Sequence, residues 1–284
     1  MFLRKMPRSL LKAMFREEES ELSFNFDYQG ASFTELLHTE SIHALPYIND
    51  VHLSERELAT PLPTGTTILA LCYDDGVLIA GDRRAVEGHR ISSKRIKKVY
   101  KTDQYSVMAI AGVAGLCIDM AKLFRTELEH YEKIEGEQLV LEGKANKLAH
   151  MVRHNLPAAL QGLVVVPIFA GYDLQQEQGR IFKYDVVGGM YEEEAFYATG
   201  SGGKDARNTI KKLYCTPLDE ETAVNIAIEA LYDAAEEDAA TGGPDVLRGI
   251  YPSMKTVSHE GVRDIAAERI EALYKTFIDA KFQH

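Results

Sequence analysis

The chain has 284 residues, of which 45% are hydrophobic and 26% charged, and its formal net charge is −11. This composition is typical of a globular protein long enough to bury one large core or two small ones. The negative charge argues against a nucleic-acid binder, and no apolar run reaches the roughly 18–20 residues that a membrane span needs.

The chain begins with a basic stretch. Met1–Arg16 contains five Lys or Arg residues and no acid, with apolar residues between them. Lys12 interrupts the apolar residues, whereas a secretory signal needs an unbroken apolar core, so the pattern favours an amphipathic basic helix. Such a helix would suit a membrane-surface contact, a transit peptide or part of a removable leader, and we favour the leader.

The chain changes character near Thr66. Before it, long periodic segments are lacking, and Ala59–Gly65 contains two prolines and a glycine, which predicts an extended, exposed linker. After it, the apolar runs Thr67–Tyr73 and Val77–Ala80 flank an Asp-Gly turn, which predicts a β-hairpin. We therefore expect a removable leader over residues 1–65 and a folded domain over residues 66–284.

Further strands and helices follow in groups. The predicted elements are a strand Tyr105–Ala111, a helix spanning Cys117 to Tyr131, a helix near Lys144–Leu160, strands Leu163–Tyr172, Arg180–Val187 and Ala195–Ala198, helices near Gly203–Leu213 and Glu220–Ala235, a strand near Met254–Ser258 and a helix near Asp264–Phe277. Pro157 should bend or shorten the second helix. Consecutive strands predict an α/β layered sandwich (αββα), with two antiparallel sheets flanked by helices, over a doubly wound parallel sheet.

The cysteines and other short motifs exclude several site types. Three separated cysteines, Cys72, Cys117 and Cys215, predict neither a disulfide framework nor a metal site, but small buried side chains in a reducing, cytoplasmic setting. Gly200–Lys204 lacks the residues of a phosphate-binding loop. Glu192–Glu194 is interpreted as a solvated charge run.

The Gly65–Thr66 junction carries the candidate chemistry. A threonine hydroxyl is a weak nucleophile that needs a base, and its own α-amine, with a reference pKa of about 7.7–8.0, can serve. That amine exists only if Thr66 is the first residue, so cleavage between Gly65 and Thr66 must come first. A glycine before the nucleophile would allow the strained bend that self-attack requires.

Several motifs accompany this junction in a fixed order. They are Gly81–Arg84, Leu128–Gly136, Thr241–Asp245 and Arg248–Pro252. With them, the chain resembles the β subunits of the 20S proteasome, most closely the actinobacterial type, over about residues 66–269. The resemblance implies an N-terminal-nucleophile hydrolase fold.

The resemblance also implies roles for individual residues. Thr66 matches the nucleophile, and Asp82 matches the carboxylate that hydrogen-bonds the active-site lysine. Lys98 matches that lysine, whose charge should lower the pKa of the amine and polarise the hydroxyl. Lys97 is the rival for this role. Spacing favours Lys98, and alternation supports it if Ile96, Lys98 and Tyr100 share a strand face.

Four more residues complete the implied site. Gly112 matches the residue whose backbone N–H forms the oxyanion hole. Ser201, Asp238 and Thr241 match the set that holds the N-terminus; the family usually has serine where Thr241 stands, so a hydroxyl is retained.

The positions that match the first specificity pocket are apolar apart from one tyrosine hydroxyl and should favour apolar substrate residues: Ala85, Ile96, Tyr100, Ile110, Ala114 and Ile118.

The implied function is a threonine endopeptidase that degrades unfolded or tagged proteins and needs no cofactor. Its implied partners are protein and peptide substrates, α-subunit rings stacked on a homo-heptameric β ring in a 28-mer core, and an ATPase regulator, without nucleic acid or membrane. Three alternatives remain open: an inactive subunit of the same fold, a small-molecule amidohydrolase of the same superfamily, and the simpler bacterial two-ring protease.

Overall fold

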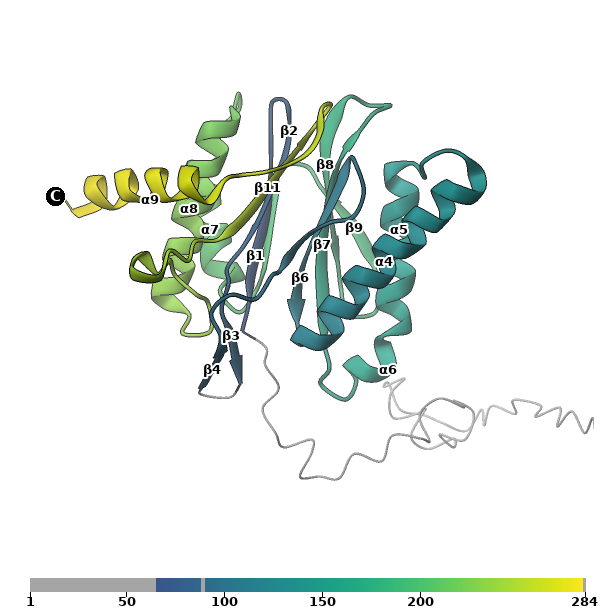
Figure 1. Ribbon diagram of the computed structural model, residues 1–284, viewed down its shortest axis with the longest axis horizontal. Helices are drawn as coiled ribbons and strands as arrows, with labels where there is room; N and C mark the ends of the chain where they lie inside the picture. Colours follow the sequence, from purple (N-terminus) through teal and green to yellow (C-terminus); the bar gives the residue numbers. More distant parts are fainter. Residues whose placement is uncertain (1–64, 88–89, 283–284) are drawn as a thin grey trace, which may run out of the picture. The chain divides into compact units, whose positions relative to one another are not determined.

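The computed structural model describes residues 65–87 and 90–282. The expected leader, apart from Gly65, therefore lies outside the described residues. Two five-stranded sheets, with all strand pairs antiparallel, form the centre of the described part (Figure 1).

The first sheet contains β1, the strand that Thr66 directly precedes. Its strands, in spatial order, are β10 (Phe196–Gly200), β1 (Thr67–Tyr73), β2 (Gly76–Gly81), β11 (Ser253–Ser258) and β12 (Gly261–Asp264). The order in the second sheet is β5 (Val99–Lys101), β6 (Ser106–Gly112), β7 (Val165–Asp173), β8 (Gln178–Tyr184) and β9 (Met190–Glu193). A separate hairpin pairs β3 (Ala85–Glu87) with β4 (Arg90–Ser93).

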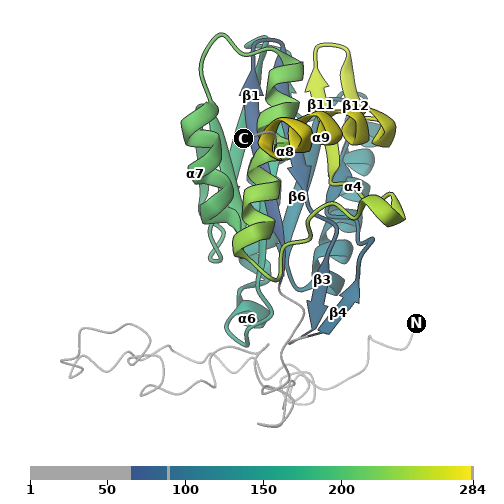
Figure 2. The ribbon, with the colours of Figure 1, turned by 90° about the vertical axis from the view of Figure 1, so that its left-hand side faces the viewer.

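Helices cover the outer face of each sheet (Figures 1 and 2). Beside the second sheet lie α4 (Ala114–Glu135), α5 (Leu141–His154) and the short α6 (Leu156–Ala159). Beside the first sheet lie α7 (Gly203–Leu213), α8 (Glu220–Glu237) and α9 (Ala267–Phe282), with a short 3-10 helix, η2 (Val246–Arg248), between α8 and β11. The predicted αββα sandwich is thus confirmed.

Three apolar clusters hold these four layers together, and β1 shows why. Alternate side chains of a strand point to opposite faces. Ile68 and Ala70 pack between the two sheets, whereas Leu69 and Leu71 pack against α7, α8 and α9. Because both faces of β1 are buried, its sequence is apolar throughout instead of alternating.

The helix expected over Lys144–Leu160 is shortened, as predicted from Pro157. It ends at His154 and is followed after Asn155 only by the short α6, because Pro157 cannot donate the backbone hydrogen bond that would continue α5. Glu192 and Glu194 are exposed, as expected of a solvated charge run, but Glu192 and Glu193 also lie in a strand, β9, that was not predicted. Glu192 forms an ion pair of 2.6 Å with Arg180 of β8, and Glu193 forms one with Lys183 of the same strand.

The three cysteines are free, as expected, but only Cys117 is fully buried, and Cys215 is exposed. None of the described helices is long and apolar enough to cross a membrane. Within the described ranges, no cluster of three or more His, Cys, Asp or Glu side chains is placed to hold a metal ion.

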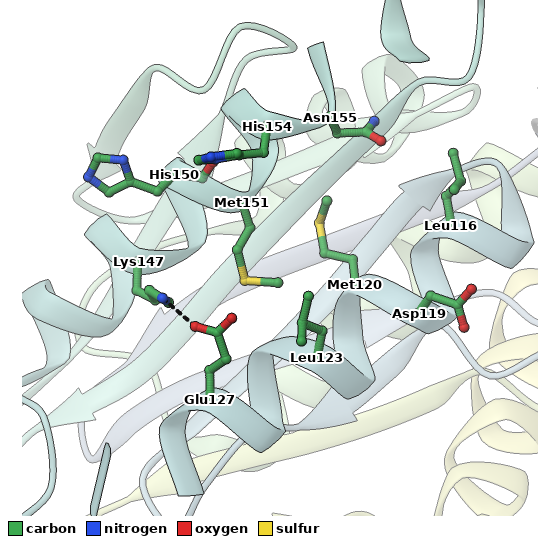
Figure 3. Close-up of a pocket in the computed structure, with 10 residues that line it drawn as sticks. All are labelled: Leu116, Asp119, Met120, Leu123, Glu127, Lys147, His150, Met151, His154 and Asn155. Carbon is green, nitrogen blue, oxygen red and sulfur yellow. Dashed lines mark hydrogen bonds and ion pairs between the residues drawn. The ribbon is translucent and has the colours of Figure 1, made fainter. Parts of the chain in front are cut away.

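A broad groove of about 660 Å³ lies between α4 and α5 (Figure 3). Met120 and Leu123 of α4 and Met151 of α5 point into it, and an ion pair between Glu127 and Lys147 bridges the two helices at one end. None of the residues predicted to do chemistry lines this groove. The predicted site residues gather at a much smaller hollow, described next.

Candidate active site

Thr66 lies immediately before β1, with 4% of its surface exposed. Its hydroxyl donates a hydrogen bond of 2.6 Å to the carbonyl oxygen of Gly65. Its backbone N–H donates to Ser201 Oγ at 3.3 Å, and its carbonyl accepts from the Ser201 N–H at 2.8 Å. The turn after β10 therefore fixes the backbone on the C-terminal side of the Gly65–Thr66 bond.

A buried ion pair lies beside the same peptide bond. Lys98 Nζ donates to Asp82 Oδ1 at 2.6 Å and to the Gly65 carbonyl oxygen at 3.2 Å. The lysine side chain is 4% exposed and the carboxylate is fully buried. The carboxylate also accepts hydrogen bonds of 2.8–2.9 Å from the backbone N–H groups of Thr67, Arg84 and Gly242. These partners compensate the burial of the charge and fix its position.

The environment changes the proton affinity of the lysine. Burial lowers the pKa of Lys98 below its ordinary value, and the negative charge and hydrogen bond of Asp82 oppose that shift. A lysine in this state gives up a proton more readily than one on the surface, while it still presents a polarising N–H donor to the Gly65 carbonyl.

Both lysines line the hollow beside Thr66, but Lys98, and not Lys97, donates to the Gly65 carbonyl oxygen. Lys97 is exposed, with its ammonium group 5.9 Å from the centre of the Tyr100 ring. The argument from strand alternation was wrong, however, because Ile96 and Lys98 precede β5 and lie in no strand. Lys98 is directed inward by the irregular segment before β5.

Gly112 ends β6 and faces the same hollow as Thr66. Its φ angle is +129°, and a Cβ built on it would lie 2.1 Å from the carbonyl oxygen of Val164. Both the conformation and the lack of space exclude a side chain. The backbone of Gly112 is thus left bare at the hollow, as a hydrogen-bond donor for a reacting carbonyl requires.

Ser201, Asp238 and Thr241 gather on the other side of Thr66. The Thr241 hydroxyl donates to Asp238 Oδ2 at 2.6 Å, and the Ala240 N–H donates to Asp238 Oδ1 at 3.0 Å. Burial alone would raise the pKa of Asp238, but hydrogen bonds from Ser201, Thr241 and backbone N–H groups outweigh it and lower the pKa. A carboxylate is therefore held close to the Thr66 nitrogen by way of Ser201.

Five of the six predicted pocket residues line the hollow beside Thr66: Ala85, Ile96, Tyr100, Ile110 and Ala114. Ile118 is not among its lining residues, and Cys117, one position earlier on α4, lines it instead. Burial raises the pKa of Cys117 to about 12, so the thiol is neutral near pH 7. The floor of the hollow is therefore apolar and uncharged on the α4 side.

Space explains why a glycine precedes Thr66. A Cβ built on Gly65 would lie 2.5 Å from Ala240 Cβ and 2.6 Å from Val86 Cγ2. The residue is therefore small because the chain passes between these two neighbours. The expectation that a glycine here permits the strained bend needed for self-attack stays a prediction.

Comparison with known proteins agrees with this arrangement. Residues 62–247 match the model of the family described as "Proteasome subunit". The chain belongs to the proteasome subunit family. It is 51% identical over 244 residues to a protein named "Proteasome subunit beta" from Acidimicrobium ferrooxidans, a match that covers 86% of this chain and 88% of the relative.

Two further relatives of the same printed name are similar over most of their lengths. The protein from Rhodococcus jostii is 48% identical, and the match covers 93% of this chain and 94% of that relative. The protein from Streptomyces griseus is 47% identical, and the match covers 89% of this chain and 90% of that relative. The resemblance to actinobacterial proteasome β subunits is thus confirmed.

Sequence reasoning missed several residues of this proteasome-family site. Cys117 lines the pocket, Thr67 contacts Thr241, and Arg84 and Gly242 contribute only backbone N–H groups to Asp82. A backbone donor leaves no signature in residue type. Thr67 was detectable in principle, since a second threonine after the nucleophile stands out in an otherwise apolar strand.

Proposed function

We propose that this chain is the catalytic β subunit of a proteasome core and acts as a threonine-type endopeptidase, with Thr66 as its nucleophile. One observation carries the proposal: Gly65 O accepts hydrogen bonds from both the Thr66 hydroxyl and Lys98 Nζ. A nucleophile and a polarising cation thus meet at one peptide bond.

The first reaction is cleavage of the chain's own Gly65–Thr66 bond. Thr66 Oγ attacks the Gly65 carbonyl carbon, the hydroxyl proton is transferred to the Thr66 nitrogen, and the C–N bond breaks. An ester between Gly65 and Thr66 Oγ results. Water hydrolyses that ester, which leaves a carboxylate on Gly65 and a free amine on Thr66. Lys98 supports the attack by drawing electron density toward the carbonyl oxygen.

The second reaction is hydrolysis of substrate peptides. The freed Thr66 amine accepts the hydroxyl proton, through water, as Oγ attacks a substrate carbonyl. The Gly112 N–H stabilises the oxyanion, and the amine returns the proton to the leaving nitrogen. Water then releases the acyl group and restores the hydroxyl. Ser201, Asp238 and Thr241 hold the new N-terminus in place.

The proposal includes substrate class and assembly. The apolar hollow beside Thr66 suits an apolar side chain on the acyl side of the cleaved bond. The "Proteasome subunit beta" names of the relatives support assembly with other subunits. We propose a heptameric β ring between α-subunit rings in the cytoplasm, served by an ATPase, because enclosure keeps such a site from unselected proteins.

The decisive experiment is N-terminal sequencing of the assembled protein together with peptide turnover. A mature chain that begins at Thr66, and turnover that disappears in Thr66→Ala, are expected. Thr66→Ser is the matched control, since it retains a hydroxyl and should retain measurable cleavage. A mature chain that begins elsewhere, or activity that survives Thr66→Ala, would overturn the proposal. Turnover of small amides alone would favour an amidohydrolase.

A further inference from the structure

Four groups form a hydrogen-bonded chain behind Thr66. The Gly202 N–H donates to Thr67 Oγ1 at 3.0 Å. Thr67 Oγ1 lies 2.6 Å from Thr241 Oγ1, which lies 2.6 Å from Asp238 Oδ2. Thr67 and Thr241 are both fully buried, so their hydroxyl groups must find partners inside the protein.

The chemistry of the groups sets the direction of this chain. A carboxylate can only accept hydrogen bonds, so the single hydroxyl proton of Thr241 goes to Asp238. Thr67 must then donate its proton to Thr241, and its oxygen remains free to accept from Gly202. All donors thus point toward Asp238. Thr67 links two separate segments of the polypeptide, one with Gly202 and one with Asp238 and Thr241.

Those two segments carry the groups on the nitrogen side of Thr66. Gly202 directly follows Ser201, whose Oγ accepts from the Thr66 N–H. Asp238 lies at the other end of the hydrogen-bonded chain. We propose that Thr67 is a positioning residue for the catalytic amine, which aligns Ser201 and Asp238 through one hydroxyl group. This inference rests on the proposed function of Thr66.

Close packing around Gly202 supports the inference independently. A Cβ built on Gly202 would lie 2.6 Å from Thr67 Oγ1 and 2.8 Å from Thr241 Oγ1. The turn after β10 therefore rests directly on the two hydroxyl groups. Removal of the Thr67 hydroxyl would leave the Gly202 N–H without its acceptor, and the turn that carries Ser201 would shift to satisfy it.

The charged groups around the amine determine how a shift would be detected. Asp238 lies on one side, and the Asp82–Lys98 pair lies on the other. Cys117 near Lys98 is a neutral thiol. A displaced Asp238 would stabilise the protonated amine less, so the amine would lose its proton at a lower pH.

The test uses two matched pairs in the assembled, processed protein: wild type against Thr67→Val, and Thr67→Ser against Thr67→Ala. Within each pair the side chains differ chiefly by the hydroxyl. Loss of the hydroxyl is expected to lower kcat roughly ten- to hundredfold with KM little changed, because a small misplacement of a catalytic group has effects of this size. The acidic limb of the kcat–pH profile should move to lower pH.

The outcomes separate this inference from the proposed function. If Thr66→Ala is inactive but Thr67→Ala and Thr67→Ser have the same kcat and pH profile, the positioning role is refuted and the nucleophile is retained. A general structural defect would lower the melting temperature without a change in the pH profile. The Ser–Ala pair also decides the question if Thr67→Val fails to fold. In a Thr241→Val background, Thr67→Val should have little additional effect, because the hydrogen-bonded chain to Asp238 is already interrupted.

Discussion

The two sides of Thr66 are built from different chemistry. On the carbonyl side of the Gly65–Thr66 bond, a fully buried carboxylate and a lysine form an ion pair, and the lysine reaches the Gly65 oxygen. On the nitrogen side, the Thr66 N–H donates to the Ser201 hydroxyl, and the Asp238 carboxylate accepts from the Thr241 hydroxyl. A fixed charge suits polarisation of a carbonyl, whereas hydroxyl groups, which donate and accept, suit a nitrogen that must exchange protons.

Removal of Lys98 should have the largest effect, since it abolishes the charged side. Lys98→Ala should slow self-cleavage and peptide hydrolysis by about 10³-fold, the upper range for loss of one electrostatic donor. It should also cost about 3–5 kcal/mol in the free energy of unfolding, because Asp82 would remain buried without its counter-charge. Gel analysis of processing and chemical denaturation measure the two effects.

The matched control for this prediction is the neighbouring lysine. Lys97 is exposed and does not contact Asp82 in the described residues, so Lys97→Ala should process and hydrolyse peptides within a few-fold of wild type. Equal losses in the two variants would contradict the division of the site into a charged and a hydroxyl side.

Gly65→Ala should come next and should affect only the first reaction. The added Cβ would collide with Ala240 and Val86, and overpacking of about 1–3 kcal/mol corresponds to roughly 5- to 150-fold slower self-cleavage. Because Gly65 leaves with the leader, protein that has matured should hydrolyse peptides at the wild-type rate. Time courses of processing and turnover of the mature fraction separate the two steps.

A compensating change sharpens this prediction. Ala240→Gly removes the Cβ nearest to the added methyl group, so Gly65→Ala with Ala240→Gly should process faster than Gly65→Ala alone. If the double variant is no faster, the narrow space beside Ala240 is not what requires glycine before Thr66.

A smaller effect is expected at the floor of the pocket. Cys117 lines the hollow beside Thr66, and Ile118 does not. Cys117→Ala should therefore enlarge the pocket and shift the ratio of kcat/KM between large and small apolar acyl-side residues by roughly tenfold, the range for one extra group in an apolar pocket. Ile118→Ala should leave that ratio unchanged. A larger shift in Ile118→Ala would instead support the pocket predicted from the sequence, which includes Ile118.

Sequence patterns identified the fold where local signals were strong. Both the β1–β2 hairpin and α7 (Gly203–Leu213) have the predicted positions, because apolar runs and turn residues determine them locally. β9 was missed, since its glutamates look solvated until the cations of β8 are brought beside them. An edge strand depends on its partner strand, which local sequence does not contain.

The site was predictable only where a motif could be matched. Gly112 and Lys98 were located by resemblance, whereas the strand-alternation argument for Lys98 was wrong. Strand alternation could not place a lysine that lies in an irregular segment. The crowding of Gly65 by Ala240 and Val86 arises from contacts across the fold that no spacing rule describes.

The smallest expected effect concerns the hydroxyl side and its dependence on pH. Hydrogen bonds lower the pKa of Asp238 in the folded protein below its ordinary value of about 3.9. The carboxylate therefore stabilises the fold above that value, and the contribution is lost as the pH falls through the lowered pKa. Asp238→Asn should be less stable than wild type near pH 7, and the difference should shrink below about pH 4. Denaturation at several pH values, with the exposed Asp279→Asn as control, tests this. A difference that stays constant from pH 7 to pH 3 would mean that packing, and not ionisation, is what Asp238 contributes on the hydroxyl side.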